Sequence, residues 1–269
     1  MPLAIVFDPA FAIEPVIDEL VRQNVVHSVV KNNQQLELWV DDPALVPGVE
    51  RYYQAYCRSN QHALSIDNLK RVPVTALVLC LTLLVALVTQ LGEHNIEWFL
   101  MAQMQYYPRD WYLYEGAQNI WRCITPIFLH FSIEHLIFNS LTFWYLGGLL
   151  ERVTGRVFFI ALVLVLAVVG NASQLLFSGP LFGGLSGVVY GFIGMAFIYQ
   201  LKVINLGIPK GLFYLSIGWL VLGVSGVFSA MGLFNVANAA HVGGLVGGLV
   251  MAVLYLAWLK VKVKVKNEY

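Results

Sequence analysis

The stretch Gly183–Gly191, GGLSGVVYG, places one hydroxyl among closely spaced glycines at the start of a strongly apolar segment. A hydroxyl in hydrocarbon hydrogen-bonds to its own helix, joins two helices or takes part in chemistry, because no water is available to it. A second glycine-dense stretch, AHVGGLVGG at Ala240–Gly248, carries His241, the only histidine after residue 135. A serine and a histidine in two such stretches suggest a nucleophile, Ser186, and its general base, His241.

The composition is that of a membrane protein with several spans. The chain has 269 residues, of which 58% are hydrophobic and 12% charged, and its mean hydropathy is +0.69. The net charge is zero, so nucleic acid is not an expected partner. The three cysteines show no CxxC pairing, so we expect no disulfide framework and no metal cluster. No cofactor is expected either. No secretory signal opens the chain, which places the N-terminus in the cytosol.

The first sixty residues predict a small cytosolic α+β domain, residues 1–60. Its expected elements are a strand at Leu3–Phe7, a helix at Ala10–Gln23, strands at Val25–Val30 and Leu36–Val40 around a turn at Lys31–Asn33, and a helix at Pro43–Cys57. No catalytic constellation is visible in it, so an accessory or regulatory role is expected. A polar linker, residues 61–71, follows it.

Residues 72–269 predict an all-α domain of six transmembrane helices. The expected spans are Val72–Leu91, Ser132–Leu150, Val157–Phe177, Ser186–Leu201, Leu212–Phe228 and Ala240–Leu259. Between the first two, Gly92–Arg122 is rich in Trp and Tyr and too polar to span, as expected of a segment at a membrane interface. Lysine and arginine flank alternate connections, which predicts that both termini are cytosolic. The lysine-rich tail predicts affinity for anionic membrane lipids.

Three polar residues share a depth in this arrangement. Ser186 lies sixteen residues from Lys202 and His135 sixteen from Glu151, about 24 Å along a helix, and His241 lies nineteen from Lys260, about 28 Å. In a hydrocarbon core about 30 Å thick, all three therefore lie just below the outer surface. Hydroxyls and imidazoles that only join helices have no need to agree in depth.

Small residues recur at helical spacing beside these groups. The fourth span has Gly187 and Gly191 as GxxxG, and the sixth carries His241, Gly244 and Gly248 on one stripe. Such spacing lets two backbones approach closely, which brings the Ser186 hydroxyl within hydrogen-bond reach of the imidazole. His135 and Asn139 are spaced i and i+4, so they project from one face of the second span, as Ser186 and Tyr190 do in the fourth.

Any Ser186–His241 pair must work without an acid, because no Asp or Glu lies between Arg152 and Lys260. Loss of the carboxylate from a soluble triad costs about 10⁴ in rate, so slow turnover is expected, with Tyr190 packed on the imidazole as a partial substitute. The serine motif also differs from the soluble-hydrolase elbow GxSxG, since Val188 stands at its last glycine.

Taken together, these motifs resemble the rhomboid intramembrane serine proteases, in particular their six-span bacterial branch. The resemblance covers nearly the whole chain and is carried by GLSGVVYG around Ser186, AHVGGLVGG around His241, HFSIEHLIFN at His130–Asn139, Trp121-Arg122 and YLGGLLE ending at Glu151. It implies that Ser186, with Gly184 and Gly187 beside it, is the nucleophile and that His241 is the general base. It implies an oxyanion hole formed by the Ser186 N–H, His135 and Asn139. It further implies that the fifth span and the loop over the site gate substrate access.

The expected activity is that of an intramembrane endopeptidase that cuts transmembrane protein substrates near their outer ends through an acyl-enzyme. In a bacterial inner membrane its site would open toward the periplasm. A catalytically inactive rhomboid-like escort is the main alternative, and a small-solute transporter lacks the intramembrane charges it would need. A zinc site at His130, Glu134, His135 and His241 is disfavoured, because H-x-x-x-E-H is one residue longer than the inverted zincin motif. His130 itself is as well suited to holding a loop or a water as to touching substrate.

Overall fold

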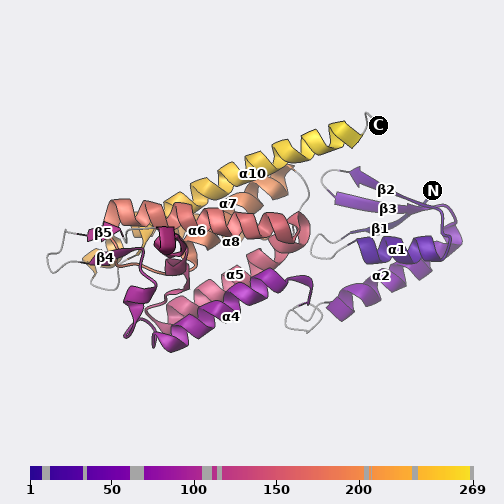
Figure 1. The fold of residues 1–269 in the computed structure, drawn as a ribbon. Helices are drawn as coiled ribbons and strands as arrows, with labels where there is room; N and C mark the ends of the chain where they lie inside the picture. Colours follow the sequence, from indigo (N-terminus) through magenta and orange to yellow (C-terminus); the bar gives the residue numbers. More distant parts are fainter. Residues whose placement is uncertain are drawn as a thin grey trace. The chain divides into compact units, whose positions relative to one another are not determined.

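The computed structural model in Figure 1 describes residues 1–7, 13–32, 35–60, 70–104, 111–113, 117–202, 206, 208–231 and 236–266. The chain divides into two compact units. One comprises Met1–Pro73 with Tyr199–Ile208, and the other comprises Val74–Ile198 with Pro209–Tyr269.

The first unit is built on a three-stranded antiparallel sheet with two helices. In chain order it contains β1 (Leu3–Val6), α1 (Glu14–Arg22), β2 (His27–Asn32), β3 (Gln35–Val40), the 3-10 helix η1 (Pro43–Leu45) and α2 (Val46–Asn60). The strand order is β1-β3-β2, and Leu38 and Val40 of the central strand are fully buried. Alternate residues of β3 thus point into a core that the apolar faces of the helices complete.

Two expected boundaries in this unit are wrong. β2 begins at His27, two residues after the predicted start, and continues through Lys31 and Asn32, which were predicted to form a turn. Strand pairing explains the difference, because Lys31 pairs with Leu36 and Asn32 with Gln35. The first residues of the helix predicted at Ala10–Gln23 lie outside the described part of the chain.

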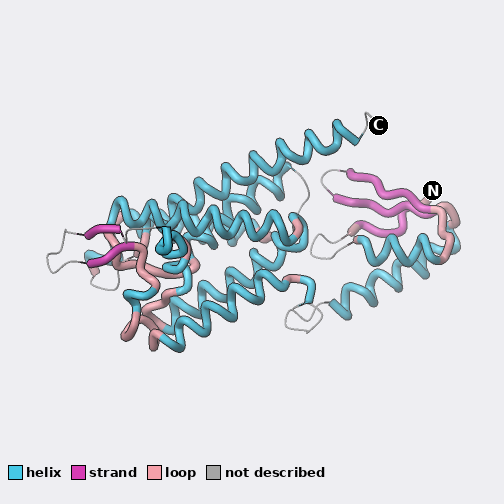
Figure 2. Tube along the Cα trace, viewed as in Figure 1, coloured by secondary structure: helices cyan, strands magenta, loops and turns pink. Residues whose placement is uncertain are grey.

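The second unit is helical (Figure 2), and its longer helices overlap in sequence with the six segments predicted to span a membrane. They are α4 (Pro73–Val88), α5 (Ile133–Thr154), α6 (Arg156–Ser178), α7 (Ser186–Lys202), α8 (Lys210–Val224) and α10 (Asn238–Lys266). Helix α6 packs along α10 and against α5, and α10 also contacts α8. Among the described helices, α6 and Asn238–Trp258 of α10 are long and apolar enough by themselves to cross a bilayer, whereas α4 and α8 are apolar but shorter.

The predicted fifth span is wrong at its end. Helix α8 ends at Val224, four residues before the predicted end, and a separate short helix, α9 (Val227–Ala230), follows. Gly226 between them has φ of +76°, a left-handed conformation that glycine adopts without steric cost and that an α-helix cannot contain. Hydropathy continues through this break because α9 is apolar too, so the apolar run concealed the helix end.

The aromatic segment before α5 folds as short pieces held by one arginine. It contains the 3-10 helices η2 (Ile96–Trp98), η3 (Ala117–Cys123) and η4 (Thr125–Phe128), and an antiparallel pair of β4 (Ala102–Met104) with β5 (Trp111–Leu113). Nη1 of Arg122 donates to the carbonyl oxygens of Glu97 at 2.7 Å, Trp98 at 3.1 Å and Leu100 at 3.2 Å. The sequence did not indicate this strand pair, and Tyr106, Tyr107 and Tyr114 of the same segment lie outside the described residues.

A buried carboxylate ties the start of α4 to the end of α5. Glu151 is 2% exposed and accepts hydrogen bonds from the backbone N–H of Val74 at 3.0 Å, and from the N–H and hydroxyl of Thr75, both at 2.8 Å. The first N–H groups of a helix have no partner within the helix, and the carboxylate supplies one. The contact joins residues 76 and 77 positions apart and fixes two helices against each other.

Candidate active site

Ser186 begins α7, and Gly183 and Gly184, shortly before it, contact the loop at Pro126–Leu129, which includes the end of η4. The N–H of Gly184 donates to the Pro126 carbonyl oxygen at 3.0 Å. A Cβ on Gly183 would overlap the Leu129 side chain, so a residue with a side chain does not fit there. The glycines before the serine therefore allow this loop to set where α7 begins.

Gly184 must be glycine for two reasons. Its φ is +122°, which residues with a Cβ rarely adopt. A Cβ there would also lie 2.7 Å from both Cε1 and Nε2 of the His135 imidazole and 3.3 Å from Nδ2 of Asn139. The bare backbone at Gly184 thus lets both side chains from α5 approach the residues that lead into Ser186.

The structure brings Ser186 and His241 together. Nε2 of His241, in the first turn of α10, lies 2.8 Å from Oγ of Ser186. His241 is buried at 6% exposure, whereas Ser186 is half-buried. Nδ1 of His241 makes no hydrogen bond within the part of the chain that the structure describes. The hydroxyl and the imidazole therefore form a pair with no acidic third member among the described residues.

Close backbone contact between α7 and α10 sets this distance. A Cβ on Gly244 would overlap the Gly187 carbonyl oxygen, and a Cβ on Gly248 would overlap that of Gly191. The other atom facing Gly187 is the Ala240 carbonyl oxygen, 3.3 Å from where its Cβ would stand. Only helices without side chains at these crossing points can approach so closely.

Tyr190 packs on the imidazole. The rings of Tyr190 and His241 are stacked, with centroids 4.5 Å apart and planes 23° apart. The Tyr190 hydroxyl donates to the carbonyl oxygen of Ser216 in α8 at 2.9 Å. The ring that limits the tilt of His241 is thus itself anchored to a third helix, through a contact that no sequence pattern indicates.

The amide of Gln174 fixes the start of α10. Its Oε1 accepts a hydrogen bond from the N–H of Ala240 at 3.0 Å, one residue before His241. Gln174 is buried at 5% exposure on α6. A glutamine that faces a helix start in this way has no sequence signature beyond its polarity in an apolar segment.

Polar side chains in the first two turns of α5 contact one another and His130, which precedes the helix. Ser132 caps the helix, accepting a hydrogen bond from the His135 N–H at 3.2 Å. Nδ2 of Asn139 lies 3.1 Å from Nε2 of His130, and the rings of His130 and His135 are 4.8 Å apart. Within the described residues, no group of three or more His, Cys, Asp or Glu side chains is arranged to hold a metal ion.

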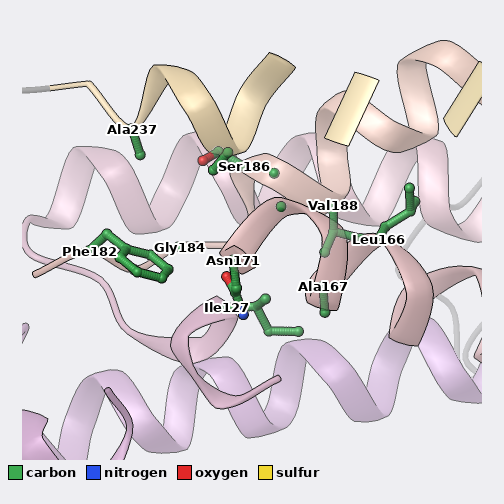
Figure 3. Close-up of a pocket in the computed structure, with 13 residues that line it drawn as sticks. Ile127, Leu166, Ala167, Asn171, Phe182, Gly184, Ser186, Val188 and Ala237 are labelled. Carbon is green, nitrogen blue, oxygen red and sulfur yellow. The ribbon is translucent and has the colours of Figure 1, made fainter. Parts of the chain in front are cut away.

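A small hollow lies beside the serine (Figure 3). Ser186 lines it together with Ile127, Asn171 and Phe182, and much of the remaining wall is Gly or Ala, at Gly170, Ala167, Ala237 and Ala240. Nδ2 of Asn171 donates to the Cys123 carbonyl oxygen at 2.9 Å, which holds this side chain against the wall. The hollow is small and mostly apolar and lies directly against the hydroxyl.

Comparison with known proteins gives one consistent result. The family model of the Rhomboid domain matches residues 117–258. The chain is 36% identical to the protein named Rhomboid protease GlpG of Photorhabdus laumondii over 247 residues, which is 82% of this chain and 83% of that one. It is 33% identical to the protein of the same name from Yersinia enterocolitica over 262 residues, 88% and 90% of the two chains. For the one from Serratia proteamaculans the identity is 40% over 186 residues, 68% and 63% of the two.

Proposed function

Because the chain belongs to the rhomboid family of intramembrane serine proteases, we propose that Ser186 is the nucleophile of this endopeptidase and His241 its general base. Family membership makes the protein an integral inner-membrane hydrolase that acts on transmembrane substrates. The observation that carries the residue assignment is the 2.8 Å separation of Ser186 Oγ and His241 Nε2. A base must lie within about 2.6–3.2 Å of the proton donor it serves.

In the proposed reaction, Oγ of Ser186 attacks the scissile carbonyl carbon while Nε2 of His241 takes the hydroxyl proton. The tetrahedral intermediate then collapses, and the imidazolium gives that proton to the leaving amine as the C–N bond breaks. Water attacks the resulting acyl-enzyme, with His241 again removing a proton and returning it to Ser186. The cycle releases a new carboxyl end and restores the hydroxyl.

The negative oxygen of the intermediate needs donors on one side of Ser186. We assign that role to the backbone N–H of Ser186 and to the side chains of His135 and Asn139. Ser186 stands at the N-terminus of α7, where backbone N–H groups lack helical partners and the helix dipole favours negative charge. The approach of both α5 side chains to the Gly184 backbone supports their assignment.

The Tyr190 ring restrains His241 in place of an orienting carboxylate. Because Nδ1 of His241 has no hydrogen-bond partner among the described residues, ring stacking and burial orient the imidazole. Stacking supplies no charge to stabilise the imidazolium that forms on proton transfer. We therefore expect turnover well below that of triad proteases, for which loss of the acid costs about 10⁴.

We propose that α4, α5, α6, α7, α8 and α10 are six membrane spans, with residues 1–60 as a cytosolic domain, residues 61–71 as a linker and residues 72–269 as the membrane domain. The positive-inside rule places both termini in the cytosol and Ser186 toward the periplasm. Substrate segments must unwind there before a peptide carbonyl can reach Oγ. Gly- or Pro-containing segments with a small residue before the scissile bond fit the small, Gly- and Ala-walled hollow beside Ser186.

The test is cleavage of a fluorescent transmembrane substrate by the full chain in proteoliposomes, with the cut site mapped by mass spectrometry. The variants Ser186→Ala and His241→Ala are expected to fold normally but to show no cleavage. A fluorophosphonate probe should label the wild-type chain at Ser186 alone. Wild-type cleavage by either variant would refute the dyad. Labelling of single cysteines placed at either end of α10 from outside the vesicle tests the orientation.

A further inference from the structure

We propose that His130 is a positioning residue: it fixes which way the side-chain amide of Asn139 faces, and thereby keeps an N–H donor aimed at the oxyanion. The inference rests on the catalytic role proposed above for Asn139. The juxtaposition that carries it is a three-membered hydrogen-bond chain that runs from the Phe128 carbonyl through the His130 imidazole to the Asn139 amide.

The chain is buried and short. His130 is 0% exposed and Asn139 is 7% exposed. Nδ1 of His130 lies 3.2 Å from the Phe128 carbonyl oxygen, and its Nε2 lies 3.1 Å from Nδ2 of Asn139. Buried polar atoms of this kind must keep their partners, because an unsatisfied polar group loses its hydration without gaining a hydrogen bond.

The first contact settles the tautomer of the histidine. A carbonyl oxygen can only accept, so Nδ1 must carry the hydrogen that lies between His130 and Phe128. A neutral imidazole has one N–H, so Nε2 then has a lone pair and can only accept. The backbone carbonyl at the end of η4 thus makes the other side of the ring an acceptor.

The acceptor in turn settles the amide. Only Nδ2 of Asn139 can donate to Nε2 of His130, so the amide cannot turn over without setting its Oδ1 against a lone pair. Nδ2 has a second hydrogen, and this nitrogen lies 3.3 Å from the Cβ position of Gly184, two residues before the nucleophile. The orientation that satisfies His130 is therefore the one that leaves a donor on the side of Ser186.

Reversal of the amide would replace that donor by a carbonyl oxygen, which repels a developing negative charge. Removal of one oxyanion donor lowers kcat by about 10²–10³ in a well-studied serine protease. Without His130 both amide orientations become accessible, and we expect kcat to fall about 10- to 100-fold, with KM nearly unchanged because the contact matters only when charge develops.

The imidazole also has a structural part, which the test must separate. His130 follows the loop that supports the start of α7, since the Pro126 carbonyl oxygen of that loop accepts from the N–H groups of both Leu129, at 3.1 Å, and Gly184, at 3.0 Å. A purely structural role predicts loss of stability and an activity loss that does not depend on what stands at residue 139.

The experiment is a double-mutant cycle in the full chain, in which kcat, KM and thermal unfolding are measured for His130→Leu and Asn139→Ala singly and together. Positioning predicts that His130→Leu lowers kcat in the wild-type background and has almost no further effect once Asn139 is alanine. His130→Gln should recover much of kcat, because its Oε1 can accept from Nδ2 in place of Nε2.

Outcomes divide cleanly between this inference and the function it rests on. An Asn139→Ala variant with wild-type kcat refutes the oxyanion role of Asn139. If Asn139→Ala has a lowered kcat and His130→Leu lowers kcat by the same further factor in that variant as in wild type, the positioning role of His130 is refuted, while the oxyanion role of Asn139 stands. If His130→Leu does not fold, ¹⁵N-histidine NMR of the wild-type chain, with the His130 signals identified by their loss in His130→Gln, still decides: a hydrogen on Nε2 instead of Nδ1 overturns the inference.

Discussion

Gly244→Ala should separate Ser186 from His241, its proposed base, without changing either residue. A Cβ at this position would overlap the Gly187 carbonyl oxygen. The nearest atoms all belong to the Gly187 backbone, so no flexible side chain can move aside. Carbon and oxygen atoms need about 3.5 Å, so α7 and α10 must part by roughly 1 Å or more. Gly244 lies one turn after His241, so nearly all of that displacement reaches the imidazole.

The consequence for the Ser186–His241 contact follows directly. The 2.8 Å Oγ–Nε2 distance would grow to about 3.8 Å, outside the 2.5–3.2 Å range of hydrogen bonds to oxygen. Misplacement of a catalytic group by about 1 Å can cost 10² in rate, and overpacking of a close-packed contact costs about 1–3 kcal/mol of stability. We therefore expect kcat/KM to fall by about 100-fold, with a lower temperature of unfolding.

Gly247→Ala is the matched control, because it adds the same methyl group to the same helix. Its Cβ would meet Cδ2 of Leu166 at 3.2 Å and Cγ1 of Val169 at 3.5 Å, both ends of side chains that can shift by a few tenths of an ångström. Cleavage of the fluorescent transmembrane substrate and fluorophosphonate labelling are measured for both variants. Equal kcat/KM and equal labelling rates in the two would refute the claim that backbone contact sets the dyad distance.

Three further changes test contacts around the site. Glu151→Gln removes the charge and puts an amide NH₂ against the N–H groups of Val74 and Thr75, so the unfolding free energy should fall by about 2–3 kcal/mol. Thr75→Val, which removes only the hydroxyl bond, should lower it less, and chemical denaturation of Glu151→Gln that matches wild type would contradict the stabilising role of the carboxylate. Tyr190→Phe keeps the stack on His241 but loses the bond to the Ser216 carbonyl oxygen, so kcat should fall only a few-fold, whereas Tyr190→Ala should lower it at least about tenfold; equal kcat values would show that the ring does not restrain the imidazole. Gln174→Leu leaves the Ala240 N–H without its acceptor, so thermal unfolding should show a loss of about 1–3 kcal/mol, and an unchanged melting temperature would mean that the start of α10 is held by other contacts.

The sequence alone predicted the helical domain, the α+β N-terminal unit and the pairing of Ser186 with His241, for reasons that are local. Long apolar runs indicate helices, because a helix satisfies its own backbone hydrogen bonds and can place a whole run of apolar side chains away from water. The alternation of apolar and polar residues in β3 indicates a strand, because successive side chains face opposite sides. Glycines at Gly187, Gly191, Gly244 and Gly248 indicate where backbones touch, since spacing of four residues keeps them on one face. Ser186 and His241 stand out because reactive polar groups are rare in segments otherwise so apolar.

Only the tertiary structure decided the contacts that join a side chain to a distant backbone group. The Arg122 bonds to three carbonyl oxygens, the Glu151 bonds to the start of α4 and the Gln174 bond to Ala240 have no period and no spacing rule. Hydropathy did not indicate the end of α8 at Val224, because it reports how strongly side chains prefer an apolar environment. The break at Gly226 comes instead from the backbone dihedral angles of that residue. The proposed orientation of the Asn139 amide likewise depends on the backbone carbonyl of Phe128, eleven positions earlier. Every residue has a backbone carbonyl, so only the fold decides which one contacts His130.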